Sequence, residues 1–90
     1  EPRLKRIRGS IASARLDAVI SLAFHTSRSA MVGLIKGEKV FVNGRVISSA
    51  SCLLKENDVI SVRGYGKFIY RGLANQTKKG RYFAEVDVFV

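Results

Sequence analysis

The stretch SRSAMVGLIKGEKVFVNGR, residues 27–45, decides the fold of this chain. Its first part predicts a helix, because the hydroxyl of Ser27 can cap the first turn and apolar side chains follow at helical spacing. These apolar residues are Ala30, Met31, Leu34 and Ile35. Gly37 stands where a residue in the left-handed conformation commonly ends a helix. Beyond it the apolar period changes to two, and Asn43-Gly44 predicts a tight hairpin turn.

The sides of this helix and hairpin that are expected to face outward are basic or hydrogen-bonding. Arg28 and Lys36 lie two turns apart, about 12 Å along the axis at 1.5 Å per residue, which suits two phosphate contacts. Lys39, Asn43 and Arg45 come from the hairpin that follows. Because the connection is short, we expect one continuous face that binds nucleic acid, and structured RNA in particular. Asn43 also has a purely structural interpretation, as the residue that forms the turn.

Composition limits the functional classes. The 90 residues allow one small domain, and a hydrophobic content of 47% is enough for a modest core. Sixteen Lys and Arg against seven Asp and Glu give a net charge of +9, which favours nucleic acid first and an anionic membrane second. No apolar run approaches the roughly 18 residues of a membrane span, and no signal-peptide pattern is present. A single cysteine excludes an internal disulfide, and the cytoplasm is the default location.

The N-terminal segment, residues 1–12, is basic and has two interpretations. It is either a solvated arm or linker, or an edge strand, and in both cases it would add phosphate contacts. Residues 13–90 then form a single domain. Because the chain begins at Glu1 inside a charged run, we expect a piece of a longer protein.

Residues 13–24 predict the first helix, with Ser13 as its N-cap. Its apolar stripe consists of Leu16, Val19, Ile20, Ala23 and Phe24. Arg15 lies in the first turn, at the positive end of the helix dipole, where a cation is disfavoured. It therefore either marks an anionic ligand or is an arginine that is exposed or paired with a nearby carboxylate.

The C-terminal half predicts strands at residues 59–62, 67–73 and 82–90, where apolar and polar side chains alternate. Asn57 is expected in a left-handed turn before the first of them, and residues 75–81 form a polar loop. The fold class is therefore α+β. Two N-terminal helices, arranged like a helix-turn-helix, pack on a small and mostly antiparallel sheet with a C-terminal strand pair.

Catalysis is not expected, because an enzyme needs convergent groups such as a nucleophile with a base. His25 and Cys52 are each the only residue of their type, and the seven acids are scattered. Cys52 is interpreted as a small buried apolar residue. The sequence therefore predicts no catalytic residue, metal ligand, cofactor or small-molecule substrate. A parent enzyme that modifies RNA and uses this piece to hold it remains an alternative.

Five short motifs, taken in order, resemble the S-four RNA-binding domain, the αL-motif module named after a small-subunit ribosomal protein. They are Arg15-Leu16-Asp17, Ser27-Arg28-Ser29, Leu34-Ile35-Lys36, Val40-x-Val42-Asn43-Gly44 and Asn57-Asp58-Val59-Ile60-Ser61-Val62. The match covers residues 15–63. Residues 63–68 and 77–81 are similar to the C-terminal domain of YlmH-like proteins, cytosolic bacterial factors linked to the large ribosomal subunit and to the rescue of stalled translation.

The resemblance implies a set of RNA contacts and a class of partner. The contacts are Arg15, Ser27, Arg28, Ser29, Lys36, Lys39, Asn43, Gly44 and Arg45. The partner is structured RNA, either ribosomal RNA or tRNA, on the ribosome, and no membrane is involved. Ala30 departs from the pattern, which often has lysine there. Charge alone predicts a weaker secondary site at Arg6, Arg8, Lys78, Lys79 and Arg81.

Two further classes stay open. One is a helix-turn-helix DNA-binding domain with residues 28–36 as recognition helix, although Ser29, Val32 and Gly33 offer little to base edges. The other is a protein-interaction or membrane-surface module that uses the basic segment and the last strand, since an exposed strand edge can pair with a partner.

Overall fold

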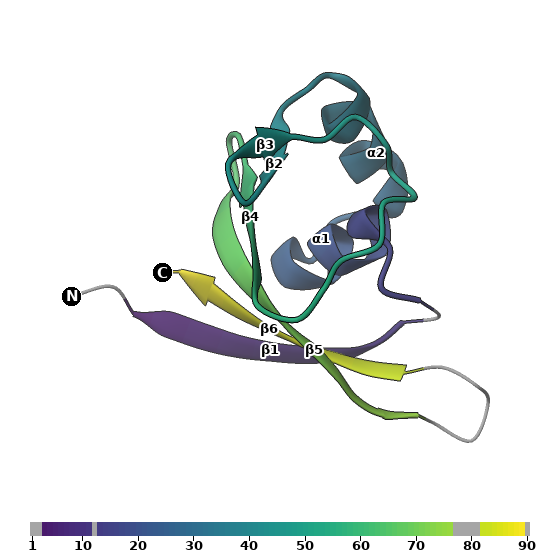
Figure 1. The fold of residues 1–90 in the computed structure, drawn as a ribbon, viewed down its shortest axis with the longest axis vertical. Helices are drawn as coiled ribbons and strands as arrows, with labels where there is room; N and C mark the ends of the chain where they lie inside the picture. Colours follow the sequence, from purple (N-terminus) through teal and green to yellow (C-terminus); the bar gives the residue numbers. More distant parts are fainter. Residues whose placement is uncertain (1–2, 12, 77–81, 90) are drawn as a thin grey trace.

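The computed structural model describes residues 3–11, 13–76 and 82–89, which form two helices and a six-stranded antiparallel sheet (Figure 1). The elements in chain order are β1 (Leu4–Ile11), α1 (Leu16–Phe24), α2 (Arg28–Lys36), β2 (Val40–Val42), β3 (Arg45–Val46), β4 (Asp58–Val62), β5 (Gly66–Gln76) and β6 (Tyr82–Phe89). The order across the sheet is β1-β6-β5-β4-β2-β3. The expected α+β class is confirmed.

The core lies between the helices and one face of the curved sheet. Alternate residues of β4, β5 and β6 supply the sheet side: Ile60, Val62, Phe68, Tyr70, Ala84, Val86 and Val88. The helices supply Leu16, Val19, Ile20, Ala23, Met31 and Ile35. In α2 only part of the expected stripe is buried, because Leu34 is half-buried and Ala30 is exposed. The opposite face of the sheet has no helix on it (Figure 1).

Helix α1 begins at Leu16, three residues later than predicted, and Arg15 occupies the N-cap position without a side-chain cap. The prediction of Ser13 as N-cap is therefore wrong. The physical reason is a tertiary contact, because the N–H groups of Leu16 and Asp17 donate to the carbonyls of Cys52 (2.8 Å) and Ala50 (3.3 Å). The loop before β4 thus supplies the acceptors that a capping side chain usually provides.

The ends of α2 are set by local hydrogen bonds. Ser27 Oγ accepts the N–H of Ala30 at 3.2 Å, which confirms the predicted N-cap. At the other end, Gly37 has an ordinary φ of −79°, so its predicted left-handed conformation is wrong. Glu38 takes that role, with φ 61°. The N–H groups of Glu38 and Lys39 reach back to the carbonyls of Ile35 and Leu34 at 3.1 and 3.0 Å, which is a Schellman motif.

The hairpin between β2 and β3 has the predicted tight turn. Asn43 and Gly44 both have positive φ, 52° and 85°, and Val42 lies opposite Arg45. Asn57 is left-handed as expected, with φ 72°. These turns place the hairpin tip beside the start of β4.

The basic N-terminal segment is a strand rather than an arm. Residues 4–11 pair with β6 along their whole length, from Leu4 opposite Phe89 to Ile11 opposite Tyr82. Gly9 permits this packing, because a Cβ there would collide with the side chain of Leu22 on α1. β5 continues to Gln76, so the first two residues of the predicted polar loop belong to a strand, and residues 77–81 lie outside the described residues.

None of the helices in the described residues is long and apolar enough to cross a membrane alone. The pair α1 and α2, bent by 119°, meets the length and composition criteria only together.

Candidate nucleic-acid interface

The start of the interface is an ion-pair group that joins the two helices. Arg15 at the N-cap of α1 and Arg28 in the first turn of α2 both donate to Asp17 Oδ2, at 3.3 and 3.2 Å. The Asp17 side chain is only 4% exposed, and its Oδ1 accepts the N–H of Ala18 at 2.8 Å. The sequence left open whether Arg15 marks an anionic ligand or is exposed or paired with a carboxylate. In the structure it pairs with the carboxylate of Asp17. Two cations share one carboxylate, so the group keeps a net positive charge on its exposed side.

The two helix N-termini differ in what they offer to an anion. The first N–H groups of α1 are occupied by the loop before β4. In α2 the N–H of Ala30 is occupied by the Ser27 hydroxyl, and that of Met31 by the Ser27 carbonyl. Within the described chain, the N–H groups of Arg28 and Ser29 remain without an acceptor. A phosphate oxygen can bind there, beside the Arg28 guanidinium.

Three predicted cations lie at the end of α2 or beyond it, and within the described residues none of them forms an ion pair. Lys36 ends the helix, Lys39 precedes β2 and Arg45 begins β3. All three are exposed, and none forms an ion pair with another described residue. Sequence reasoning missed a fourth cation, Arg63, whose N–H donates to the Lys39 carbonyl at 3.0 Å. Its only signal in the sequence was its position directly after the strand predicted at residues 59–62.

Asn43 has a structural role at the hairpin tip. Its Nδ2 donates to Asp58 Oδ1 at 3.0 Å, and its Oδ1 accepts the N–H of Val59 at 2.9 Å. The side chain therefore fixes the hairpin to β4, and one amide N–H is left for a ligand. Gly44 beside it is exposed, with nothing within 4 Å of a Cβ built there.

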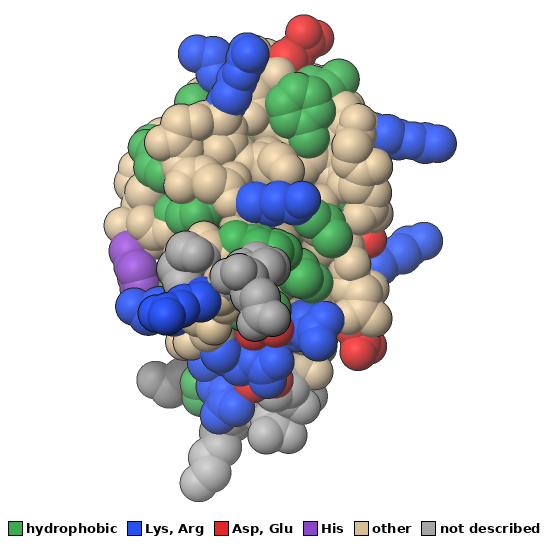
Figure 2. Space-filling model, turned by 90° about the vertical axis from the view of Figure 1, so that its left-hand side faces the viewer, with side chains coloured by type: hydrophobic (Ala, Val, Ile, Leu, Met, Phe, Trp, Pro, Cys, Tyr) green, Lys and Arg blue, Asp and Glu red, His purple; other side chains and the backbone are tan. Residues whose placement is uncertain are grey.

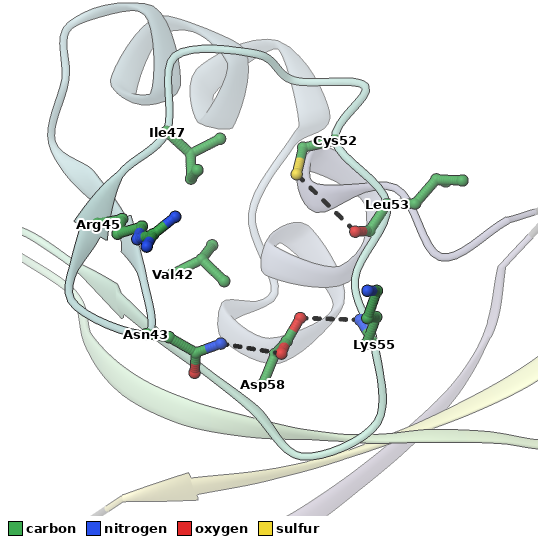
Figure 3. A pocket seen from close by; sticks show the side chains of 8 residues that line it. All are labelled: Val42, Asn43, Arg45, Ile47, Cys52, Leu53, Lys55 and Asp58. Carbon is green, nitrogen blue, oxygen red and sulfur yellow. Dashed lines mark hydrogen bonds between the residues drawn. The ribbon is translucent and has the colours of Figure 1, made fainter.

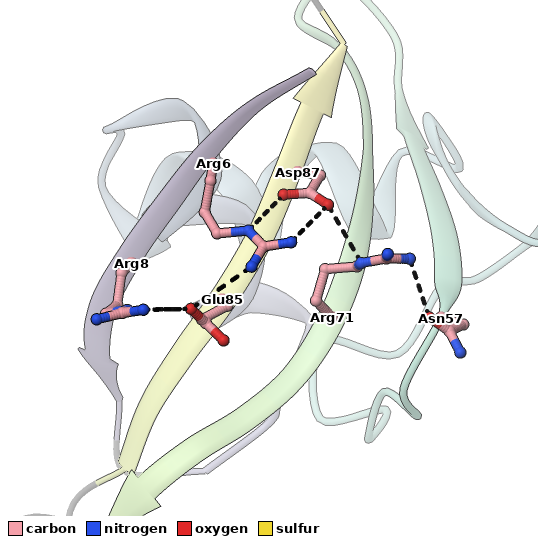
Figure 4. A network of polar contacts seen from close by, with 6 residues as sticks. All are labelled: Arg6, Arg8, Asn57, Arg71, Glu85 and Asp87. Carbon is pink, nitrogen blue, oxygen red and sulfur yellow. Dashed lines mark hydrogen bonds and ion pairs between the residues drawn. The ribbon is translucent and has the colours of Figure 1, made fainter.

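The arginines of the predicted secondary site lie on the other face of the sheet, within a network of ion pairs (Figure 4). Arg6 donates to both carboxylate oxygens of Asp87, at 2.8 and 3.1 Å, and Arg8 donates to Glu85 at 2.6 Å. Arg71 of β5 reaches Asp87 at 3.1 Å from its other side. The hydrogen bonds from Arg6 hold the pKa of the Asp87 carboxyl below its usual value. Lys78, Lys79 and Arg81 lie outside the described residues.

The contrast between these regions is visible on the surface. In Figure 2, acidic and basic side chains lie against one another in the lower half of the molecule, whereas in the upper half basic side chains project around apolar ones and acidic side chains are seen at the top and right-hand edges. The lower half contains the strand network of β1, β5 and β6, and the upper half contains the hairpin and α2. On the helix–hairpin side, the exposed side chains of Lys36, Lys39 and Arg45 are therefore free to meet an anion.

The side chains that could bind a metal ion or act in catalysis do not lie close together in the described part of the chain. Among the described residues, no three His, Cys, Asp or Glu side chains are grouped closely enough to hold a metal ion. His25 ends α1 in the left-handed conformation, with φ 53°, which fits its interpretation as a turn residue. Cys52 is half-buried rather than buried as expected.

Comparison with known proteins identifies the family of this chain. The family model of the S4 domain, the S-four type, matches residues 14–60. The chain belongs to the S4-domain family. It is also similar to the ribosome-associated protein quality control protein P2 of Bacillus subtilis, with 33% identity over 73 residues. That match covers 81% of this chain, and the chain spans 28% of the length of that relative.

Proposed function

We propose that this domain binds structured RNA through the helix–hairpin face. This name denotes the set Arg15, Ser27, Arg28, Ser29, Lys36, Lys39, Asn43, Gly44, Arg45 and Arg63. The observation that carries the proposal is the distribution of unpaired charge. Lys36, Lys39 and Arg45 have no acidic partner among the described residues, although acids are available elsewhere in the same small domain. A folded domain with exposed, unpaired cations on one side attracts a polyanion to that side.

The contacts follow from the chemistry of each group. The guanidinium of Arg28 can form two parallel hydrogen bonds with a phosphate, next to the free N–H groups at the start of α2. Lys36 and Lys39 supply point charges along the backbone, and Arg45 extends the track to the hairpin tip. A-form RNA is recognised mainly through its backbone and shape, so a rigid array of cations on a helix and a hairpin suits it.

The RNA that we propose is ribosomal RNA or tRNA on the large ribosomal subunit, with a role in translation or in the rescue of stalled ribosomes. Support comes from the similar Bacillus subtilis protein, whose name describes it as ribosome-associated and active in protein quality control. The working location is accordingly the cytoplasm. We propose a binding role without catalysis for these residues.

Salt dependence of binding tests the proposal. Four to six phosphate contacts predict a slope of log affinity against log salt of roughly −3 to −5 for an RNA hairpin. A DNA duplex of the same sequence and anionic vesicles serve as the competing partners. A flat salt response would exclude the phosphate contacts, and tighter binding to the DNA duplex would favour the helix-turn-helix alternative.

A further inference from the structure

A hollow of about 580 Å³ opens between the β2–β3 hairpin and the loop that leads to β4 (Figure 3). Val42, Ile47 and Cys52 form its apolar wall, while Asn43, Asp58 and Lys55 lie along the opposite edge. The volume falls within the range of about 300–1,000 Å³ that is typical of small-ligand sites. None of the predicted functions of the sequence requires this hollow.

The polar edge of the hollow is fixed before any ligand binds. Both carboxylate oxygens of Asp58 are occupied, one by Asn43 Nδ2 at 3.0 Å and the other by the N–H of Lys55 at 2.8 Å. These bonds connect the hairpin, β4 and the loop into one frame. A preformed site loses less conformational entropy on binding, so the hollow is suited to receive a ligand without rearrangement.

Two cations and the hydrogen-bonded carboxylate of Asp58 line the hollow, and the net positive charge favours an anionic ligand. The Arg45 side chain lies at one side of it, and Lys55 lies on the far side of the opening (Figure 3). Neither side chain forms an ion pair with another residue in the described part of the chain. An apolar wall with cations at its margin matches a nucleotide, which combines a flat base with a phosphate.

We propose that the hollow receives one unpaired nucleotide of the bound RNA, an inference that rests on the proposed function. The base would lie against Val42 and Ile47, with the planar guanidinium of Arg45 available to stack on it. Lys55 would contact a flanking phosphate. Because Arg45 also belongs to the helix–hairpin face, an RNA backbone that follows Lys39 to Arg45 brings the next nucleotide to the opening. A base in a duplex is stacked and paired, and therefore cannot enter.

The test compares two RNA hairpins that differ by one bulged uridine. We expect the 90-residue chain to bind the bulged hairpin about tenfold more tightly, near the lower end of the effect of one base stacked on an aromatic side chain, because none of the described residues that line this hollow is aromatic. Lys55→Gln should remove most of this preference and leave binding to the fully paired hairpin nearly unchanged. Equal affinity of the parent chain for the two hairpins would overturn the assignment.

Cys52 allows the hollow to be filled in the folded protein. Alkylation of this single thiol with N-ethylmaleimide should abolish the preference for the bulged hairpin while circular dichroism stays unchanged. The Cys52→Ser variant, treated with the same reagent, should keep the preference. A preference that survives alkylation would overturn the proposal, and if alkylation unfolds the domain, the Lys55→Gln comparison decides.

Three further outcomes separate this inference from related ones. Competition by free uridine monophosphate at micromolar concentration would assign the hollow to a free nucleotide and overturn the RNA assignment. Salt-dependent binding of the paired hairpin without any bulge preference would support RNA binding by the helix–hairpin face and overturn only the role proposed for the hollow. Loss of binding to both hairpins would contradict the proposed function itself.

Discussion

The two faces of this domain use basic residues in opposite ways. On the sheet face without helices, Arg6 and Arg8 of β1 each meet a carboxylate of β6 at 3.1 Å or less. On the helix–hairpin face, Lys39 and Arg45 meet no acid among the described residues. The difference follows from strand register, which places Arg6 opposite Asp87 and Arg8 opposite Glu85. A count of cations therefore does not locate a binding surface, because ion pairs occupy Arg6 and Arg8 and leave them less able to meet an anion.

The largest expected effect is on RNA affinity. Replacing Lys39 and Arg45 together by Glu should remove two phosphate contacts and lower the magnitude of the salt slope by about 2. Because both side chains are exposed and unpaired, the free energy of unfolding should change by less than about 1 kcal/mol. Binding titrations over a range of salt concentrations and urea unfolding measure the two quantities.

The matched control lies on the other face. Arg8→Gln combined with Glu85→Gln removes the Arg8–Glu85 ion pair and the longer Arg6–Glu85 pair at 3.8 Å, and it leaves the net charge unchanged. Its RNA affinity and salt slope should equal those of the parent chain. A loss of affinity as large as that of the hairpin variant would place the binding surface on the sheet instead.

An intermediate effect is expected at Asp17, whose carboxylate is shared by Arg15 and Arg28. Asp17→Asn replaces a buried carboxylate that accepts hydrogen bonds from Arg15, Arg28 and the N–H of Ala18. It should lower the free energy of unfolding by about 1–3 kcal/mol, as measured by urea unfolding. Arg28→Gln breaks only one of these bonds and should cost less. An unchanged unfolding midpoint in Asp17→Asn would show that the ion pairs contribute nothing to the joint between the helices.

A smaller effect concerns the pH dependence of the paired face. Arg6 lowers the pKa of Asp87 in the folded state, whereas the unfolded carboxyl titrates near pH 3.9. This pair therefore contributes its full stability above about pH 4 and loses it as the pH falls through the lower folded value. The free energy of unfolding, measured with urea at neutral pH and near pH 3, should fall less between the two pH values for Asp87→Asn than for the parent chain. Glu38→Gln is the control, because Glu38 forms no ion pair with any described residue, and its free energy of unfolding should fall as much as that of the parent chain. An equal fall in all three proteins would show that the Arg6–Asp87 pair does not contribute to the pH dependence.

The smallest effect is expected at Glu38, the one acid between two of the unpaired cations. Its φ of 61° is a conformation that glycine adopts without strain. Glu38→Gly should raise the free energy of unfolding by up to about 1 kcal/mol and also strengthen RNA binding slightly. Thermal unfolding and the binding titration check both directions. Weaker RNA binding in this variant would mean that Glu38 positions its neighbours rather than opposing the RNA.

Local signals predicted the elements whose geometry depends on neighbouring residues. The Ser27 cap and the Asn43-Gly44 turn are confirmed because each is closed by hydrogen bonds within a few residues. The Ser13 cap was wrong because a loop distant in sequence, Ala50–Cys52, supplies the acceptors for α1. The left-handed residue at the end of α2 was misplaced by one position, from Gly37 to Glu38.

Contacts between distant segments could not be predicted from local pattern. The pairing of β1 with β6 joins residues about eighty positions apart, so the partners of Arg6 and Arg8 could not be known from sequence. The same limit hid Arg63, which reaches the helix–hairpin face only through the pairing of β2 with β4. The RNA contacts themselves, including those at Lys78, Lys79 and Arg81, stay predictions.

Lysine footprinting tests the central claim most directly, because the chain carries exposed lysines both on the helix–hairpin face and away from it. Acylation of the free and RNA-bound chain, followed by mass spectrometry, reports each lysine separately. The account predicts strong protection by an RNA hairpin at Lys36 and Lys39, and unchanged reactivity at Lys5 of β1 and Lys67 of β5. Protection of Lys5 and Lys67, with Lys36 and Lys39 still reactive, would contradict the claim that unpaired charge on the helix–hairpin face binds the RNA.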